Sequence, residues 1–301
     1  MYINQINLYQ NYIYKNNLNV SLPISKNIHF KNNGFEASCE ALEKDLINYI
    51  RTNHQFKEKD IDKIYKKYCP KSAFKKAKRI QAKNSSTIDY TGNTENEYAF
   101  KKDLYGRKKA SLLKQEISVV FPAFNNHKEN SLFLGRLIHE GIHALQAECK
   151  NGTGELDIIN QFLKNESRPR LIKKNIINAS IMYEELSAQL MDYINKGAEK
   201  YSPDYSASSD EICLRCYKAK VNDLACEILK NILDDLDKEI DINFALDFCA
   251  NIAKCEIEAY TEEMKFLKSE GCYEEVRFIK SQIEANQAII DSINSIKKPF
   301  N

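Results

Sequence analysis

Apolar residues recur at helical spacing over most of this chain. In residues 134–148 they fall at i, i+3, i+4, i+8 and i+11, which places them on one stripe of an amphipathic helix. Residues 71–83 are rich in lysine and alanine and predict a short basic helix. The same reasoning predicts further helices at residues 35–53, 58–70, 175–197, 210–238, 244–268 and 273–296.

The predicted helix at residues 175–197 has an apolar face of its own. Gly197 ends it, because glycine is a common helix stop. We expect its core positions to include Ile177, Ile181, Leu186 and Leu190.

One segment, residues 116–124, has the composition of a β-strand. Its sequence EISVVFPAF is rich in β-branched and aromatic residues, and Pro122 predicts an edge position because proline cannot donate to a neighbouring strand. The polar residues 84–97 predict a loop. An edge strand leaves backbone N–H and C=O groups to which an extended peptide can add. We therefore expect an α+β fold, mostly α, with a small sheet that has an exposed edge.

Composition and charge narrow the classes of function. Apolar residues make up 43% and charged residues 29% of the chain, as in a globular protein, and no run of about 18 apolar residues predicts a membrane span. The net charge of +2 hides an uneven distribution, with 17 Lys and Arg against 7 Asp and Glu in residues 57–114, and 5 against 15 in residues 223–275. The basic segment is expected to face the acidic one or an acidic partner. No nucleic-acid-binding motif accompanies the lysines, so we do not expect nucleic acid as a partner.

The candidate chemistry lies in residues 139–143, HEGIH. His139 and His143 are two of the five histidines in the chain, and they lie one helical turn apart on one face. Two imidazoles at this spacing can bind Zn²⁺ at about 2.0–2.1 Å and leave places for a third ligand and a water. Glu140 can accept a proton from that water and pass it to a leaving amine. Without a metal, the same motif is only a polar helix surface.

A resemblance supplies the third ligand. Together with YEELSAQ at residues 183–189, HEGIH resembles the gluzincin zinc metallopeptidases, in which a glutamate on a separate helix completes the zinc site. The resemblance covers residues 139–191 and extends to the HExxH…EE pattern of clostridial neurotoxin light chains and of metallopeptidase effectors from bacterial pathogens. It implies that Glu185 binds the zinc, with Ala188 at +3 and Gln189 at +4, and that Glu184 supports a ligand from outside the coordination sphere.

Other candidates stay open beside this pattern. Gln189 stands where thermolysin-like gluzincins carry aspartate, and the Arg-x-x-Tyr motif of the neurotoxins is not found. The residue that stabilises the oxyanion therefore has four candidates, Tyr193, Tyr201, Tyr205 and Tyr260. The alternatives for the third ligand are Glu184, Glu256 with Ala259 at +3, and the acids Glu155 and Asp157 of the GELD segment.

The resemblance implies a zinc-dependent endopeptidase that hydrolyses peptide bonds of a protein substrate. It implies a zincin-like catalytic domain at residues 34–200, preceded by a loosely held arm at 1–33 and followed by a helical subdomain at 205–301. The first residues show no signal-peptide pattern and the nine cysteines are scattered, so we expect a cytosolic protein or a bacterial effector delivered to a host cytosol. Two alternatives remain: a catalytically inactive helical interaction protein and a zinc hydrolase of small amides.

Overall fold

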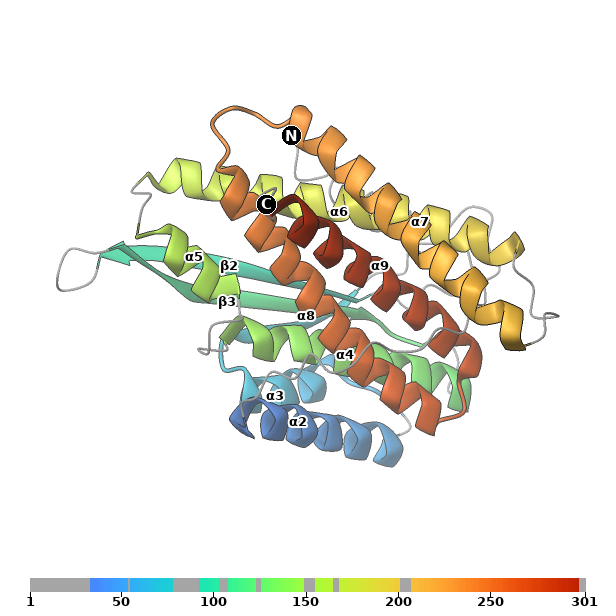
Figure 1. The fold of residues 1–301 in the computed structure, drawn as a ribbon. Coiled ribbons are helices and arrows are strands. Elements are labelled where there is room, and N and C mark those ends of the chain that lie inside the picture. Colours follow the sequence, from blue (N-terminus) through green and yellow to red (C-terminus); the bar gives the residue numbers. More distant parts are fainter. Residues whose placement is uncertain are drawn as a thin grey trace. The chain divides into compact units, whose positions relative to one another are not determined.

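A computed structural model describes residues 33–53, 55–77, 92–102, 108–122, 126–148, 155–164, 168–200 and 207–297, without the side chains of Asn33, Glu148, Pro169 and residues 195–217. Helices predominate, and three strands, β1 (Ser72–Ala77), β2 (Gly92–Lys102) and β3 (Lys108–Val120), form one small sheet (Figure 1). This confirms an α+β fold that is mostly α. The helices are α2 (Asn33–Thr52), α3 (Glu58–Tyr68), α4 (His127–Glu148), α5 (Glu155–Phe162), α6 (Pro169–Lys200), α7 (Ala207–Asp234), α8 (Ile242–Ser269) and α9 (Tyr273–Lys297).

The strand predicted at residues 116–124 exists, but it is not at an edge of the sheet. The strand order is β1-β3-β2, with β1 parallel and β2 antiparallel to the central β3. Residues 116–120 pair with β1 on one side, and residues 116–119 pair with β2 on the other. Pro122 follows the end of β3 at Val120, so its missing N–H does not restrict the pairing of this strand.

Two further predictions about the sheet were wrong. Within residues 71–83, predicted as a basic helix, Ser72–Ala77 form β1, where buried Ser72 and Phe74 alternate with half-buried Ala73 and exposed Lys75. Within residues 84–97, predicted as a loop, the chain is already in β2 from Gly92 onward. Both strands form by pairing with β3, and the composition of the two segments does not show that this partner exists. This tertiary pairing outweighs their local preference for helix or turn.

The core face of α6 differs from the predicted one. Leu186 and Leu190 are buried as predicted, whereas Ile177 and Ile181 are 52% and 44% exposed. Glu185 follows these two isoleucines at i+8 and i+4, so it shares their exposed face. In the first half of α6 the core face runs through Ala179 and Met182 instead of the predicted isoleucines.

Helix α4 is held by close contacts on two sides. A Cβ on Gly141 would lie 2.7 Å from Leu42 Cδ2 of α2 and 3.1 Å from the ring of Tyr65 of α3, so a larger residue here would require these side chains to shift. Tyr65 is fully buried and donates a hydrogen bond of 2.6 Å to the backbone carbonyl of Leu137 on α4. Gly135 allows a similar approach by Leu267 of α8. These contacts fix the helix that carries both histidines.

Contacts group the described residues into two compact units. The sheet unit contains the described residues of Lys26–Ser167 and Glu258–Tyr273, and the helical unit contains those of Arg168–Ile257 and Glu274–Asn301. Helix α8 is one continuous helix that contributes to both. The predicted boundary between a catalytic domain at 34–200 and a helical subdomain at 205–301 stays a prediction, because compactness does not show which parts fold independently. The predicted arm at residues 1–33 lies almost wholly outside the described residues.

Two expectations from composition can be compared with the described residues. None of their helices combines the length and apolarity needed to cross a membrane. Six cysteines with described side chains form no disulfide bond, namely Cys39, Cys69, Cys226, Cys249, Cys255 and Cys272.

Candidate metal centre

His139 and His143 lie on successive turns of α4 with their ring nitrogens facing each other. Their Nε2 atoms are 3.1 Å apart, and His139 is buried while His143 is half-buried. Two nitrogens bound to one tetrahedral Zn²⁺ at about 2.0–2.1 Å stand about 3.3 Å apart. The separation therefore suits a shared metal ion, and it also suits a shared proton.

Glu256 on α8 completes a group of potential metal ligands. One ligand atom from each of His139, His143 and Glu256 lies within 4.8 Å of the other two, and no other such group occurs among the described residues. Because α8 is one continuous helix, it brings further side chains to the two histidines besides Glu256. Tyr260 and Glu263 follow Glu256 at i+4 and i+7 on one face, and both contact His139.

Glu185, the third ligand expected from the sequence, is not in this group. It lies on the exposed face of α6, where its Oε1 accepts a hydrogen bond of 3.3 Å from Gln189. The neighbouring Glu184 is half-buried, and burial raises its pKa to about 6. Glu155 and Asp157 both lie on α5, also outside the group. Among the described candidates, the glutamate of α8 alone joins the two histidines.

The side of the His139 ring that faces away from His143 meets a buried charge pair. His139 Nδ1 lies 3.0 Å from Glu263 Oε2, although the contact is not aligned as a good hydrogen bond. Arg136 Nη1 lies 3.5 Å from the same oxygen, and the side chains of Arg136 and Glu263 are 8% and 4% exposed. A carboxylate in this place favours the tautomer with its proton on Nδ1, which leaves Nε2 for a metal.

The group beside Nδ1 of His143 is a neutral amide, that of Gln146, where His139 has the carboxylate of Glu263. His143 Nδ1 lies 2.9 Å from the side-chain oxygen of Gln146, whose amide nitrogen donates a hydrogen bond of 2.8 Å to Glu258 Oε2. Because that amide group is engaged with Glu258, its oxygen is directed at His143. Burial raises the pKa of Glu258, while the hydrogen bond from Gln146 and the charge of His143 act against this rise.

Glu140 is held beneath strand β2. The residue is 4% exposed, and its Oε2 accepts a hydrogen bond of 2.8 Å from the hydroxyl of Thr94. A Cβ on Gly92 would overlap Glu140 Oε1 and lie 2.8 Å from Arg136 Cδ. Glycine at this point of β2 therefore leaves the space that the carboxylate occupies.

The tyrosines proposed as oxyanion stabilisers differ in position. Tyr260 is buried with its ring centroid 4.4 Å from that of His139, which places it beside the candidate ligands. Tyr193 is half-buried on α6, and Tyr201 and Tyr205 lie outside the described residues.

Several residues around the two histidines were not identified from the sequence. Gln146 and Glu263 carry a usable signal, since one lies at i+3 from His143 and the other at i+7 from Glu256. Gly92 and Thr94 carry none, because β2 itself was not predicted. Only strand pairing brings that segment to α4.

The three potential ligands suit a divalent metal ion that binds both nitrogen and oxygen, such as Zn²⁺. Two imidazole nitrogens and one carboxylate oxygen are ligands that Zn²⁺ uses in catalytic sites, and three protein ligands leave a fourth place open. The carboxyl group of Glu263 lies against His139 and Arg136, and that of Glu258 is linked to His143 through Gln146. A concentration of carboxylates in a largely buried place favours the binding of a cation.

No model of a known protein family, no curated protein sequence and no solved structure matches this chain significantly.

Proposed function

We propose that this protein is a zinc-dependent endopeptidase of the HExxH type, with His139, His143 and Glu256 as the zinc ligands. The observation that supports this most is the group formed by these three side chains on α4 and α8. Glu256 takes the place that the resemblance to gluzincins assigned to Glu185. A zincin-like fold, a protein substrate and action as an effector in a host cytosol belong to the same proposal and rest on that resemblance.

In this proposal Glu140 is the general base. Zinc held by these three ligands would lower the pKa of a bound water towards about 7. Glu140 precedes Gly141 on the helix that carries the ligands, and Thr94 directs one of its carboxylate oxygens. Glu140 accepts the proton of the water and passes it to the leaving amine, and Tyr260 is the described tyrosine best placed to stabilise the oxyanion.

The outer edge of β2 replaces β3 as the proposed docking strand. Gln115 N donates to Lys71 O, so the backbone of every second residue from Gln115 turns towards β1 and the residues between turn towards β2. In the pairing register, Gly92 and Thr94 then direct their N–H and C=O groups away from β3. An extended peptide added at this edge lies beside Glu140.

The opposite edge of the sheet is less suitable. The outward N–H groups of β1 at Phe74 and Lys76 donate to the side chains of Asp62 and Glu58 on α3, at 2.9 and 3.0 Å. Helix α3 therefore occupies the hydrogen-bonding positions that a peptide would need on β1.

A metal assay on matched variants tests the ligand set. We expect the purified protein to bind one equivalent of zinc, Glu256→Gln to lose it, and Glu185→Gln to keep it. Retention of full zinc affinity by Glu256→Gln would exclude Glu256 as a ligand. If Glu185→Gln lost the metal instead, the arrangement first expected from the sequence would be correct.

A cleavage assay tests the reaction. Incubation with a peptide library, followed by mapping of new N-termini, should show zinc-dependent cleavage by the wild type and none by Glu140→Gln with its zinc bound. Equal cleavage by both proteins would refute the role of Glu140.

One observation favours a second candidate, a zinc hydrolase of small amides. Glu140 and His139 are only 4% and 3% exposed, and such burial suits a small substrate better than a polypeptide. Turnover of small amides without any cleavage of the peptide library would select this alternative. Absence of stoichiometric zinc would favour a catalytically inactive interaction protein.

A further inference from the structure

The end of the β2–β3 pair farthest from the candidate metal centre carries lysines directly opposite one another. Lys101 pairs with Lys109, and Lys102 pairs with Lys108. Successive side chains of a strand point to opposite faces, so each face of this hairpin end holds one Lys–Lys pair. Like charges directly opposite each other destabilise a strand pair. We call these four residues the lysine end of the hairpin.

The lysine end is not neutralised by the rest of the described chain. None of its four ammonium groups forms an ion pair or hydrogen bond with a described residue. By contrast, Lys75 on β1 and Lys114 on β3 lie 2.7 and 3.1 Å from the carboxylate of Glu116. The same sheet therefore pairs its lysines near its centre and leaves them unopposed by described residues at one end.

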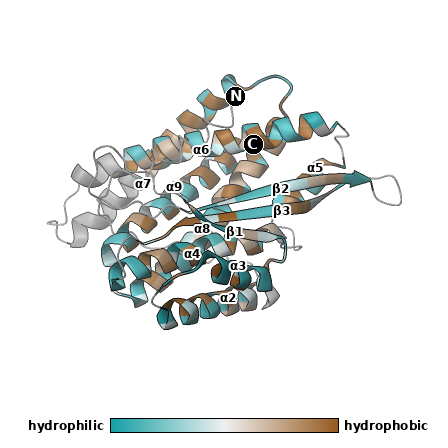
Figure 2. Ribbon diagram, turned by 180° about the vertical axis from the view of Figure 1, so that it is seen from behind, coloured by the Kyte–Doolittle hydropathy of each residue, from teal (hydrophilic) through white to brown (hydrophobic). Residues whose placement is uncertain are grey.

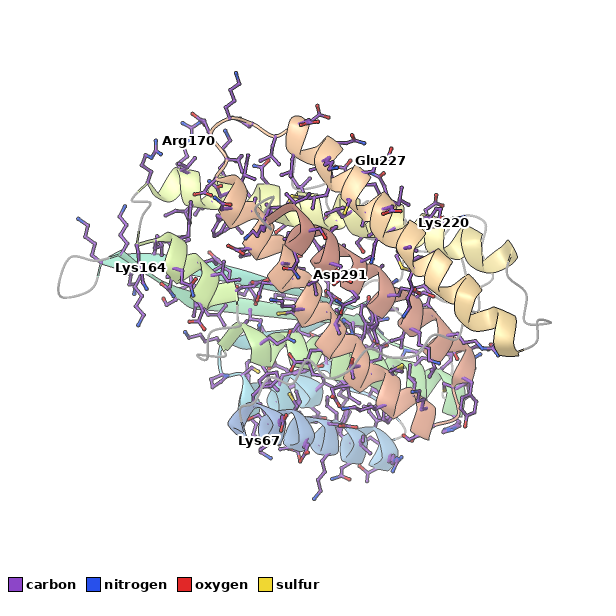
Figure 3. The ribbon with its side chains drawn as sticks, in the orientation of Figure 1. Lys67, Lys164, Arg170, Lys220, Glu227 and Asp291 are labelled. Atoms are coloured by element: carbon purple, nitrogen blue, oxygen red, sulfur yellow. The ribbon has the colours of Figure 1, made fainter. Side chains whose placement is uncertain are left out.

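A fifth lysine lies next to this end. The side chain of Asn160 on α5 accepts a hydrogen bond of 2.7 Å from Ala110 N and donates one of 3.3 Å to Ala110 O, which holds α5 against β3 one residue after Lys109. Lys164 is exposed and lies four residues beyond Asn160, and Figure 3 shows it at this side of the sheet unit.

The hairpin end extends beyond the neighbouring helices of its own unit. Figure 1 and Figure 2, taken from opposite sides, both show β2 and β3 reaching past α4 and α5. The end of β2 is coloured as strongly hydrophilic in Figure 2. Its charges can therefore approach a partner without interference from these helices.

We propose that the lysine end, together with Lys164, docks the protein on an anionic lipid surface. A groove for an acidic peptide would collect its cations on one face, whereas these lysines point to both faces of a projecting end. If the hairpin end points at a planar surface, the lysines on both faces of the hairpin can reach that surface at the same time. Each lysine near an anionic membrane strengthens binding by about fivefold, so several together give stable, salt-sensitive attachment. This attachment does not depend on the proposed peptidase activity.

Vesicle sedimentation with the full-length protein tests the proposal. We expect binding to phosphatidylcholine vesicles that contain phosphatidylserine, weakening at high salt, and no binding to phosphatidylcholine alone. Replacing the four lysines of the lysine end by glutamine should weaken binding by on the order of 600-fold, because four factors of about five multiply. The matched control, which has the same net charge and replaces exposed helix lysines, should lose far less; it changes Lys44, Lys59, Lys220 and Lys268 to glutamine.

Three results would overturn the inference. The first is failure of the wild type to prefer the anionic vesicles. The second is an equal loss of binding in the control variant, since net charge alone would then explain the attachment. The third is binding to polyglutamate or duplex DNA without binding to vesicles, which would identify another class of partner. Circular dichroism and a zinc assay on both variants show whether the fold and the metal centre persist.

Discussion

Glu263 and Glu284 are carboxylates on two helices of this protein, and their surroundings are opposite. Glu263 on α8 is 3% exposed, with Arg136 at 3.5 Å and the imidazole of His139 at 3.0 Å. Glu284 on α9 has a buried Oε1 without a hydrogen-bond partner among the described residues, and burial raises its pKa to about 7 despite the charge of Lys218.

The difference concerns which charge state each environment supports. Cationic and donor groups beside Glu263 support an ionised carboxylate, as a residue that positions a metal ligand requires. Desolvation of Glu284 supports its neutral form. Burial alone therefore does not distinguish the two carboxylates, whereas a charge partner and a candidate metal ligand beside Glu263 do.

The largest expected effect is on stability, and it comes from removing Arg136, the cationic partner of Glu263. Arg136→Met leaves Glu263 buried without its cation, which should lower the free energy of unfolding by about 3–5 kcal/mol. The double variant Arg136→Met/Glu263→Gln should recover part of this loss, because the uncompensated charge is gone. Urea unfolding of the two variants measures the difference. A double variant less stable than Arg136→Met would contradict the account.

Removal of the Glu263 charge should weaken zinc binding at the proposed metal centre. We expect Glu263→Gln to lower zinc affinity roughly 10–100-fold, the usual effect of a group that orients a ligand histidine. Glu262→Gln is a suitable control, because Glu262 pairs with Lys265 on a more exposed part of the same helix. Competition with a chelator of known affinity gives both values. Equal affinities for the two variants would remove Glu263 from the site.

Glu284 should instead make stability depend on pH. Its pKa is near 7 in the folded state and about 4.3 in an unfolded chain, so between these values the folded state binds more protons. Stability should therefore fall as pH rises from about 5 to 8, by on the order of 2 kcal/mol. Glu284→Gln should flatten this part of the profile, while Glu274→Gln, an exposed change on the same helix, should not. A profile that rises with pH and keeps its slope in Glu284→Gln would show the sign to be wrong.

The smallest effect is expected at Glu140, which a single hydroxyl directs. Thr94→Val keeps the shape of the side chain but removes its hydrogen bond to Glu140, so we expect kcat to fall about 10-fold with zinc affinity unchanged. Thr94→Ser retains the hydroxyl and should stay close to the wild type. Steady-state kinetics on a cleaved peptide separates kcat from KM. If Thr94→Ser lost as much activity as Thr94→Val, packing of β2 and not the hydroxyl would be responsible.

The local sequence pattern was sufficient to predict the helices that bury an apolar stripe along one face. The helix around HEGIH and the three C-terminal helices follow from the 3.6-residue spacing of their apolar residues, which is a property of neighbours along the chain. The same spacing places His139 and His143 on one face and Glu140 beside them. These three candidate residues needed no information from distant parts of the sequence.

Pairing across the chain decided the rest. β1 and β2 form because β3 lies between them, and neither segment has a strand pattern strong enough to be recognised alone. Whether Glu185 or Glu256 lies beside the histidines also depends on contacts between distant parts of the chain. Both stand on helices near small residues, and the packing of each helix determines whether its glutamate meets the histidines or solvent. The sequence by itself determined the HExxH motif and most of the long helices. Tertiary structure alone decided which glutamate lies beside the two histidines and which strand lies above Glu140, because contacts between residues far apart in the chain leave no periodic trace in it.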